Sequence, residues 1–267
     1  MVTNELIERI STKQVVTTDE MVETVSEITG TVQENGYVYK KFIYPLLKRK
    51  YLNRIRRNLY QVTTPGNRDN VADRFIIASM VRDDYYIGLH AALEFFGVAY
   101  SFRNHAHICV NPRDRFDVFK YQNTIYTPFL TEDTKTCVTT HMYSGRELKV
   151  CSKERLFIEC IRYPAKVGGW EEILKSLQGL GGIDFVLLLD YLLKTNNQSL
   201  IRRTGLVLEL FKENSLFYEH LEEKILRKVE NQVEGNVRYF MKGSKGDLNE
   251  RWMLYVPPDF EQYLRAI

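Results

Sequence analysis

The chain has 267 residues, of which 44% are hydrophobic and 27% are charged, which is typical of a folded protein rather than a disordered one. Its length suits one large domain or two ordinary ones, and its longest apolar runs are too short to cross a membrane. The four cysteines lack CxxC or Cys/His ligand spacing, and the N-terminal segment lacks the apolar core of a signal peptide. We therefore expect reduced thiols and a cytoplasmic protein.

The charge is distributed unevenly along the chain. The net charge is +3, yet residues 1–35 carry two bases and seven acids, and residues 61–267 carry 27 of each. The window 36–60 holds eight Lys and Arg and no acid. Such a local excess indicates binding to nucleic acid phosphates rather than a bulk property of the protein.

The first elements are predicted to be helical. Apolar spacing indicates a helix over residues ~3–12, and a second helix with Thr18 as its N-cap and Gly30 at its end. The segment YVYKKFIYPLLKRKYL (37–52) then predicts a third helix. Its apolar stripe is Tyr39, Phe42, Ile43, Leu46 and Leu47, and its opposite face carries Lys40, Lys41, Tyr44 and Lys48.

Two short strands follow the third helix. Leu52–Ile55 and Leu59–Val62 are predicted to form a hairpin, because Asn58 between them can adopt a positive φ angle. Three helices followed by a hairpin are the element order of a winged helix-turn-helix, in which the third helix enters the major groove and the hairpin, or wing, lies along the DNA backbone. A membrane-surface helix is the weaker alternative, because the hairpin interrupts the basic window.

Pro45 lies inside the predicted third helix, where proline removes a backbone hydrogen bond and clashes with the preceding turn. The sequence leaves two alternatives open. The helix either kinks at Pro45 or begins there, with Pro45 in its first turn. In the second case Lys40 and Lys41 belong to the turn before the helix.

The segment TTPGNRDN (63–70) has the composition of a linker. Beyond it, helices are predicted over 70–81 and 89–96, separated by the loop DDYYIG. Strands follow at HICV, NTIYTPF, KTCVTTHMY and ELKVC. The remaining segments predict helices: KERLFIECIR, WEEILKSLQGL, DFVLLLDYLLKT, QSLIRRTGLVLELFKE and YEHLEEKILRKV. Ser152 and Asp184 are expected to cap two of them, and Glu154 and Arg155 to form local ion pairs.

Several segments resemble the AbiEi-type proteins, which are antitoxins and transcriptional regulators of type IV toxin–antitoxin (abortive infection) systems. They are the hairpin ending RRNLY, YYIGLHAALEFFG (85–97), VCSKERLFIECI (150–161), GGWEEI (168–173), IRRTGLVLEL (201–210) and YFMKGSKGDLNERWMLYVPPD (239–259). The resemblance covers nearly the whole chain from about residue 46. Asn58 stands where the family usually has Gly, and the region between the second and third helices is longer than usual.

The resemblance implies an N-terminal winged helix that binds the chain's own promoter and a C-terminal antitoxin domain. It also implies a functional partner, a nucleotidyltransferase-like toxin that the antitoxin opposes without a stable complex. The expected fold is α+β: a winged helix-turn-helix over residues 1–66 and a larger mixed α/β domain over residues 67–267. We expect no catalytic residue, no metal and no cofactor.

The sequence leaves two other functions open. A winged-helix nuclease needs acids and a lysine on adjacent strands to hold Mg²⁺. Asp190, Glu209 and Lys212 lie on predicted helices, and Glu147 with Lys149 lacks a partner acid. An orphan transcription factor with a ligand-sensing C-terminal domain is the other alternative. His90 is expected to pack rather than to act as a base.

The residues expected to contact double-stranded DNA form two groups. Lys40, Lys41, Tyr44 and Lys48 lie in or beside the groove, and Arg54, Arg56 and Arg57 lie on the wing. Lysines and arginines mainly position a protein on the phosphates, so we expect base contacts chiefly from Tyr44.

Overall fold

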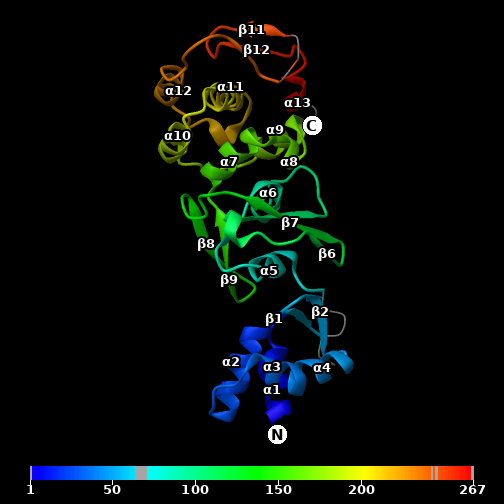
Figure 1. Cartoon of the computed structure of the whole chain (residues 1–267). Helices are drawn as coiled ribbons and strands as arrows, with labels where there is room; N and C mark the ends of the chain where they lie inside the picture. Colours follow the sequence, from blue (N-terminus) through cyan, green and yellow to red (C-terminus); the bar gives the residue numbers. More distant parts are fainter. Residues whose placement is uncertain (1, 64–70, 242, 244–245, 266–267) are drawn as a thin grey trace. The chain divides into compact units, whose positions relative to one another are not determined.

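A computed structural model of the chain describes residues 2–63, 71–241, 243 and 246–265 (Figure 1). The described residues form a mixed α/β fold with three sheets. They divide into two compact units, one drawn from residues 1–86, 108–132 and 141–148, and the other from residues 87–107, 133–140 and 149–267. The predicted boundary at residues 66 and 67 lies outside the described residues, as does all of the predicted linker except Thr63. That boundary stays a prediction.

The first unit begins with helices that surround a small sheet. In chain order the elements are α1 (Val2–Ser11), β1 (Val15–Thr17), α2 (Thr18–Thr29), α3 (Asn35–Val38), the π-helical turn η1 (Tyr39–Ile43), α4 (Tyr44–Lys48), β2 (Leu52–Arg56) and β3 (Leu59–Val62). The strand order is β1-β3-β2, and β1 and β2 both run antiparallel to β3. The hairpin was predicted, whereas β1 was not.

The start of α2 shows why β1 and α2 follow each other without a loop. The hydroxyl of Thr17 accepts a hydrogen bond from Glu20 N (3.1 Å), and the Glu20 carboxylate accepts one from Thr17 N (2.9 Å). This capping box makes Thr17 the N-cap, so the prediction of Thr18 is wrong by one residue. Gly30, with φ +69°, ends the helix as predicted.

These elements share one hydrophobic core. The apolar stripe predicted for the third helix contributes to it through Phe42, Ile43 and Leu46, while Tyr39 and Leu47 pack against its edge. The other core residues come from α1, α2, α3 and all three strands: Leu6, Ile10, Val16, Met21, Val25, Val38, Leu52, Tyr60 and Val62. Burying these apolar side chains is what fixes the helices and the hairpin to one another.

The middle of the chain forms a six-stranded sheet with the order β6-β7-β5-β4-β9-β8. Its elements are α5 (Arg74–Ser79), β4 (Tyr85–Ile87), α6 (Leu89–Phe95), β5 (His105–Val110), the 3-10 turn η2 (Pro112–Asp114), β6 (Phe119–Tyr121), β7 (Thr124–Leu130), β8 (Val138–Tyr143) and β9 (Arg146–Cys151). The four predicted strands correspond to β5, β7, β8 and β9. The predicted loop DDYYIG is wrong in part, because it contains β4, which pairs in parallel with β9.

Helices dominate the remainder of the second unit. They are α7 (Lys153–Arg162), α8 (Pro164–Val167), α9 (Trp170–Gln178), α10 (Phe185–Lys194), α11 (Gln198–Asn214), the 3-10 turn η3 (Leu216–Tyr218), α12 (Glu223–Glu230) and α13 (Gln262–Arg265). The side chains of Ser152 and Asp184 cap α7 and α10, as predicted. Arg155 pairs with Glu159 (2.8 Å), whereas Glu154 accepts a hydrogen bond from Asp184 N.

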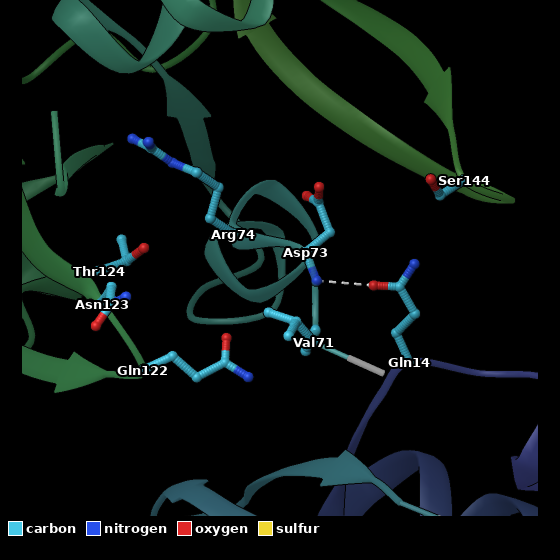
Figure 2. Close-up of a pocket in the computed structure, with 9 residues that line it drawn as sticks. Gln14, Val71, Asp73, Arg74, Gln122, Asn123, Thr124 and Ser144 are labelled. Carbon is cyan, nitrogen blue, oxygen red and sulfur yellow. Dashed lines mark hydrogen bonds between the residues drawn. The ribbon is translucent and has the colours of Figure 1, made fainter. Parts of the chain in front are cut away.

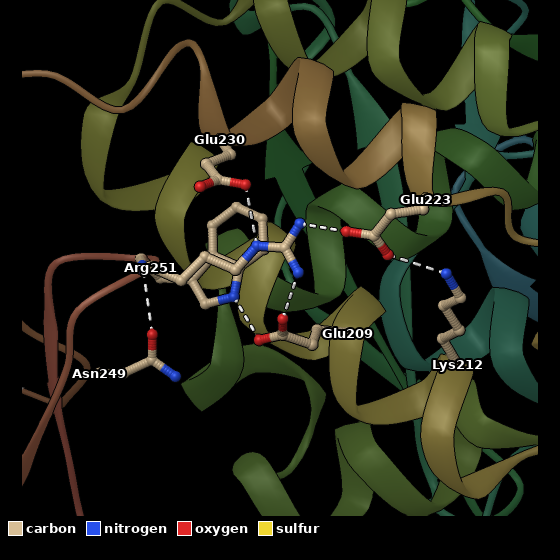
Figure 3. Close-up of polar contacts among 7 residues, drawn as sticks. Glu209, Lys212, Glu223, Glu230, Asn249 and Arg251 are labelled. Carbon is tan, nitrogen blue, oxygen red and sulfur yellow. Dashed lines mark hydrogen bonds and ion pairs between the residues drawn. The ribbon is translucent and has the colours of Figure 1, made fainter.

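The last strands, β10 (Arg238–Tyr239), β11 (Asp247–Asn249) and β12 (Leu254–Val256), form a small sheet beside α11 and α12 (Figure 1). Arg251, in the turn before β12, binds the carboxylates of Glu209, Glu223 and Glu230 at 2.6, 2.6 and 3.0 Å (Figure 3). Trp252 is buried and donates its indole N–H to Glu209 (2.6 Å). Within the described part of the chain, no helix is both long and apolar enough to cross a membrane.

Candidate nucleic-acid interface

Residues 35–48 form one helical segment in which a π-helical turn precedes Pro45. The amide of Tyr44 donates to the carbonyl of Tyr39, five residues earlier, and Pro45 lies in the first turn of α4. A wider turn suits this site because proline has no N–H and its ring clashes with the carbonyl four residues back. Pro45 therefore lies in the first turn of α4, but Lys40 and Lys41 lie in η1 and not in a turn outside the helix. On that point the second predicted alternative is wrong.

The π-helical turn changes which side chains meet on the helix surface. The ring centroids of Tyr37 and Phe42 lie 6.2 Å apart, and those of Tyr39 and Tyr44 lie 6.5 Å apart. Both pairs are five residues apart, whereas an α-helix brings together residues three and four apart. The turn therefore joins Tyr39 and Tyr44 into one aromatic surface.

The four residues predicted for the groove, Lys40, Lys41, Tyr44 and Lys48, are all exposed. Two of the lysines are held by tyrosines four residues before them. Lys41 Nζ donates to the Tyr37 hydroxyl (2.7 Å), and Lys48 Nζ lies 4.7 Å from the centre of the Tyr44 ring. These contacts keep two ammonium groups on the exposed face of the helical segment.

The hairpin continues this basic surface. Arg54 is exposed and donates to the Tyr39 hydroxyl (3.0 Å), and hydrogen bonding to Tyr60 and Tyr39 raises its pKa against the opposing effect of burial. Arg57 is exposed at the tip of the hairpin, beside Asn58 with φ +64°. The predicted positive φ at Asn58 is thus confirmed. Tyr37 and Tyr39 were not predicted as site residues, although their spacing from Lys41 and Tyr44 was visible in the sequence.

Arg56 is placed differently from the other wing arginines. Its guanidinium lies 5.0 Å from the ring centre of Phe119 and 5.5 Å from that of Phe116, and Nη1 is buried without a hydrogen-bond partner among the described residues. Burial, together with the charge of Arg82, lowers the pKa of Arg56. This arginine therefore packs against aromatic residues of the same unit and is only half exposed to solvent.

A groove of about 620 Å³ runs beside the hairpin tip. Its charged lining is mixed, with the arginines at 56, 57 and 82 and the aspartates at 19, 83, 84 and 114. Because charges of both signs line it, the groove does not extend the acid-free surface of the helix.

A second hollow of the first unit, about 540 Å³, is lined mainly by polar residues (Figure 2). In it, Asp73 N donates to Gln14 Oε1 (2.8 Å). The Asp73 carboxylate caps α5 by accepting hydrogen bonds from two backbone amides, and it also accepts one from the Tyr143 hydroxyl (2.9 Å). These bonds fix the start of α5, and they leave the carboxylate with a structural role.

The residues weighed for a nuclease are dispersed. Glu209 binds Arg251 and Trp252, and Lys212 binds Glu223 (2.9 Å) (Figure 3). Asp190 is exposed on α10, and the residues at 147 and 149 are exposed on β9. No group of three or more His, Cys, Asp or Glu side chains that could hold a metal ion occurs among the described residues.

His90 is buried at the start of α6. Its Nδ1 lies 3.1 Å from Glu94 and its Nε2 lies 3.1 Å from Glu172. The ring is buried beside two carboxylates, and its expected packing role stays a prediction.

Comparison with known proteins gives the fold class and no family. No known family and no curated protein matches the chain. The structure is similar to the crystal structure of the RV2827C protein from Mycobacterium tuberculosis, with a TM-score of 0.67 and 13% sequence identity over 99% of this chain and 94% of that chain. At this identity the similarity shows a shared fold and does not assign a function.

Proposed function

We propose that the chain is a DNA-binding transcriptional regulator of the AbiEi antitoxin type, which represses its own operon and opposes a nucleotidyltransferase-like toxin. Residues 1–66 are the proposed winged helix-turn-helix, with residues 35–48 as the recognition helix and β2-β3 as the wing. The observation that carries the proposal is the acid-free exposed face of the helical segment, which continues onto the hairpin through the hydrogen bond between Arg54 and Tyr39.

The charge distribution supports double-stranded DNA as the ligand. Positive charge gathers on the third helical segment and on the hairpin, which are the two elements that meet DNA in a winged helix. Residues 1–35 carry seven acids and only two bases. The positive charge that attracts phosphates is therefore confined to the helical segment and the hairpin. Restraint of Lys41, Lys48 and Arg54 by tyrosines lowers the entropy that these long side chains lose when they bind.

Fluorescence anisotropy with a labelled duplex from the chain's own upstream region tests the proposal. If about five cations meet phosphates, log K falls with log[salt] at a slope of about −4 to −5. Lys40→Ala with Lys48→Ala is expected to flatten the slope by about two. Lys228→Ala, at an exposed lysine of α12, is the control for removing a positive charge outside the proposed interface. Binding that does not respond to salt would remove DNA as the proposed ligand.

The antitoxin part of the proposal rests on the sequence resemblance and has its own test. Cells that express the cognate toxin should be rescued by this chain, and the two purified proteins should not form a stable complex. The toxin gene is sought in the adjacent reading frame. Rescue that disappears together with DNA binding would reduce the proposal to a plain repressor.

The nuclease alternative is tested separately, by incubating the purified chain with plasmid and Mg²⁺ or Mn²⁺. We expect no cleavage, because Glu209 and Lys212 are engaged in ion pairs with other side chains. Cleavage that is lost in Glu147→Ala or Glu209→Ala would establish an enzyme instead.

A further inference from the structure

The groove beside the hairpin tip has no role in the proposed function. Its volume of about 620 Å³ lies within the range of small-molecule sites, roughly 300–1,000 Å³. Its lining comes from the hairpin, from the junction of β1 and α2, from the segment between α5 and β4, and from η2, all in the first unit. The fold thus brings segments that are distant in sequence to one hollow.

Arg56 brings a donor without an acceptor to this groove. Its Nη1 atom is buried and has no hydrogen-bond partner among the described residues, and its guanidinium lies over the rings of Phe116 and Phe119. Aromatic rings attract the charge but accept no strong hydrogen bond. Because a buried donor without an acceptor is costly, a ligand that supplies an acceptor at this point is favoured.

Arg82 adds positive charge beside Arg56. The guanidinium carbons of the two arginines both lie 5.5 Å from the ring centre of Phe116. Arg82 uses its own donors on backbone carbonyls, those of Val81, Asp114 and Arg115, at 2.7, 2.7 and 3.0 Å. Burial and then the charge of Arg82 lower the pKa of Arg56, against the opposing charge of Asp117. This wall of the groove therefore suits a carboxylate or another anionic group.

Carboxylates line the groove as well. The side chains of Asp84 and Asp114 are half-buried, and within the described ranges neither carboxylate forms an ion pair or a hydrogen bond. The Asp19 carboxylate accepts a hydrogen bond from the first residue of α3 (3.4 Å), and Asp83 is exposed. Arg56 forms no ion pair with any of these acids, although they line the same groove. The groove therefore holds charges of opposite sign apart.

A lining of this kind disfavours a ligand of one sign. An anion such as phosphate gains from the guanidinium of Arg56 but is repelled by the aspartates, and a polyamine meets the reverse. No group of three or more His, Cys, Asp or Glu side chains suited to a metal ion occurs in the parts of the chain that the structure describes. A ligand that carries both an anionic and a cationic group satisfies both sets of side chains.

We propose that the groove binds a small zwitterion of the α-amino acid class. The ligand's carboxylate accepts a hydrogen bond from Arg56 Nη1, and its ammonium group donates to the carboxylates of Asp84 and Asp114. Its side chain meets the limited apolar lining, which comes from Leu59, Met80 and Val81. The inference goes beyond the proposed function and does not depend on it, because neither set of contacts involves nucleic acid.

Binding of the twenty L-amino acids to the full-length protein, without DNA, tests the site. Each is screened by saturation-transfer nuclear magnetic resonance, and every positive result is titrated by calorimetry. At least one amino acid should bind saturably at one site per chain. Its decarboxylated amine and its N-acetylated derivative should each bind at least about tenfold more weakly, because each lacks one charged group. If none of the twenty binds saturably at up to about 10 mM, the inference is wrong.

Aspartate variants assign the binding to this groove. Asp84→Asn and Asp114→Asn remove charge with little change of shape, and each should weaken binding of the amino acid at least about fivefold. The double variant should lose the preference over the N-acetylated derivative but keep the preference over the amine. Asp190→Asn, at an exposed acid of α10, is the matched control and should change nothing.

Arg56→Gln tests the other end of the ligand. It should remove the preference for the amino acid over its amine and keep the preference over the N-acetylated derivative. This comparison of ligands is made within one protein, so a change in the stability of the variant does not affect it. If the aspartate variants bind as the control does, or if Arg56→Gln keeps its preference over the amine, the groove is not the site. DNA binding is measured separately, so failure of this site and failure of the proposed function are distinct results.

Discussion

Single tyrosines organise the basic surface at the scale of the residue. Tyr37 holds Lys41, Tyr44 holds Lys48, and the Tyr39 hydroxyl accepts from Arg54. Each pair joins a flexible cation to a ring with only two side-chain torsions, so the cations are restrained in the free protein. A lysine on a bare helix surface would lose that freedom upon binding. If the proposed function holds, the tyrosines therefore favour affinity for DNA without adding charge.

The two arginines at the hairpin tip are predicted to behave differently when each is replaced by alanine. Arg57 is exposed, so Arg57→Ala should flatten the salt slope of DNA binding by about one and leave stability unchanged. Arg56 packs on Phe116 and Phe119, so Arg56→Ala should lower the free energy of unfolding by about 1 kcal/mol. Anisotropy titrations and urea unfolding of both variants check this. Equal effects of the two variants on the salt slope would show that Arg56 also reaches the phosphates.

Gly205 is predicted to be essential for the closing segment of the chain. A Cβ atom at this position would overlap the ring of the buried Trp252, which Arg251 and Glu209 hold in place. Gly205→Ala should therefore lower the free energy of unfolding by about 2 kcal/mol or more, despite the higher helix propensity of alanine.

The matched control is Gly36→Ala, a second helical glycine whose Cβ would meet open space. This variant should gain about 0.5–1 kcal/mol. Chemical denaturation of both variants measures whether each change lowers or raises the free energy of unfolding. A stable Gly205→Ala protein would mean that Trp252 can move, and that the network around Arg251 is not fixed.

His107 predicts a loss of stability in acid. Its pKa is lowered to about 4 in the folded protein, against about 6.5 in the unfolded chain, so the unfolded state binds more protons between these values. Stability is therefore fully present above about pH 6.5 and falls as the pH drops toward 4, by on the order of 3 kcal/mol from this group. Urea unfolding at pH 7, 6, 5 and 4.5 measures the loss. His107→Gln should reduce the pH dependence, whereas His220→Gln, at an exposed position, should leave it unchanged.

At the scale of the element, long periodic segments could be predicted and short strands could not. The helix α11 and the capped start of α10 follow from apolar spacing and from Asp184. The strands β1, β4 and β6 have three residues each, too few to show an alternating pattern. The formation of β1 and β4 depends on partners distant in sequence, such as Tyr60 opposite Val16, whereas β6 pairs with the adjacent strand β7. Pro45 predicts an irregular helix, but no pattern in the sequence distinguishes a π-helical turn from a kink.

Replacing Pro45 tests the role of that turn. Alanine restores an amide at position 45, which can donate to the Lys41 carbonyl and convert η1 into α-helix. The ring contact between Tyr39 and Tyr44 would then be lost, and Lys40 and Lys41 would rotate relative to Lys48. We expect Pro45→Ala to keep its thermal midpoint while its affinity for the upstream duplex falls about tenfold.

Proline 164 provides the control for this change, because it also lies in a first helical turn, in α8. Pro164→Ala should leave DNA affinity unchanged. Proton contacts between the rings of Tyr39 and Tyr44 in nuclear magnetic resonance spectra would report the helix geometry directly. If those contacts and the affinity both persist in Pro45→Ala, the π-helical turn is not what aligns the surface.

At the scale of the whole molecule, local charge could be predicted and distant contacts could not. The basic window, its exposed face and the positive φ at Asn58 follow from neighbouring residues. The position of Arg56 depends on Phe116 and Phe119, about 60 residues later. No local pattern in the sequence predicts that this arginine packs on those two rings. Sites built from one segment are therefore visible in the sequence, and sites built from several are not.

The first unit contains contacts that join residues on either side of the predicted linker. Gln14 accepts from Asp73 N, Glu20 binds Arg146 (2.8 Å), and Gln61 accepts from the Tyr121 hydroxyl. These bonds involve β3, the start of α2 and the turn before β1. They imply that a fragment ending at residue 66 exposes polar groups that are paired in the whole chain, so its stability should be lower.

Limited proteolysis and two fragments test whether the proposed domains act separately. The segment TTPGNRDN has a turn-forming composition, so we expect the first cleavage there. Residues 1–66 should keep non-specific DNA affinity, because the basic window ends at Arg57, but should unfold at a lower urea concentration than the intact chain.

Residues 70–267 should rescue cells that express the cognate toxin while failing to repress transcription, because this fragment lacks the basic window entirely. Arg146→Ala in the intact chain removes the ion pair with Glu20, which joins residues on either side of the predicted linker. Local opening should then cost less free energy, so we expect cleavage at a lower protease concentration. Rescue by residues 1–66 alone would show that neutralisation proceeds through repression, and the chain would then be a transcriptional repressor without an antitoxin domain.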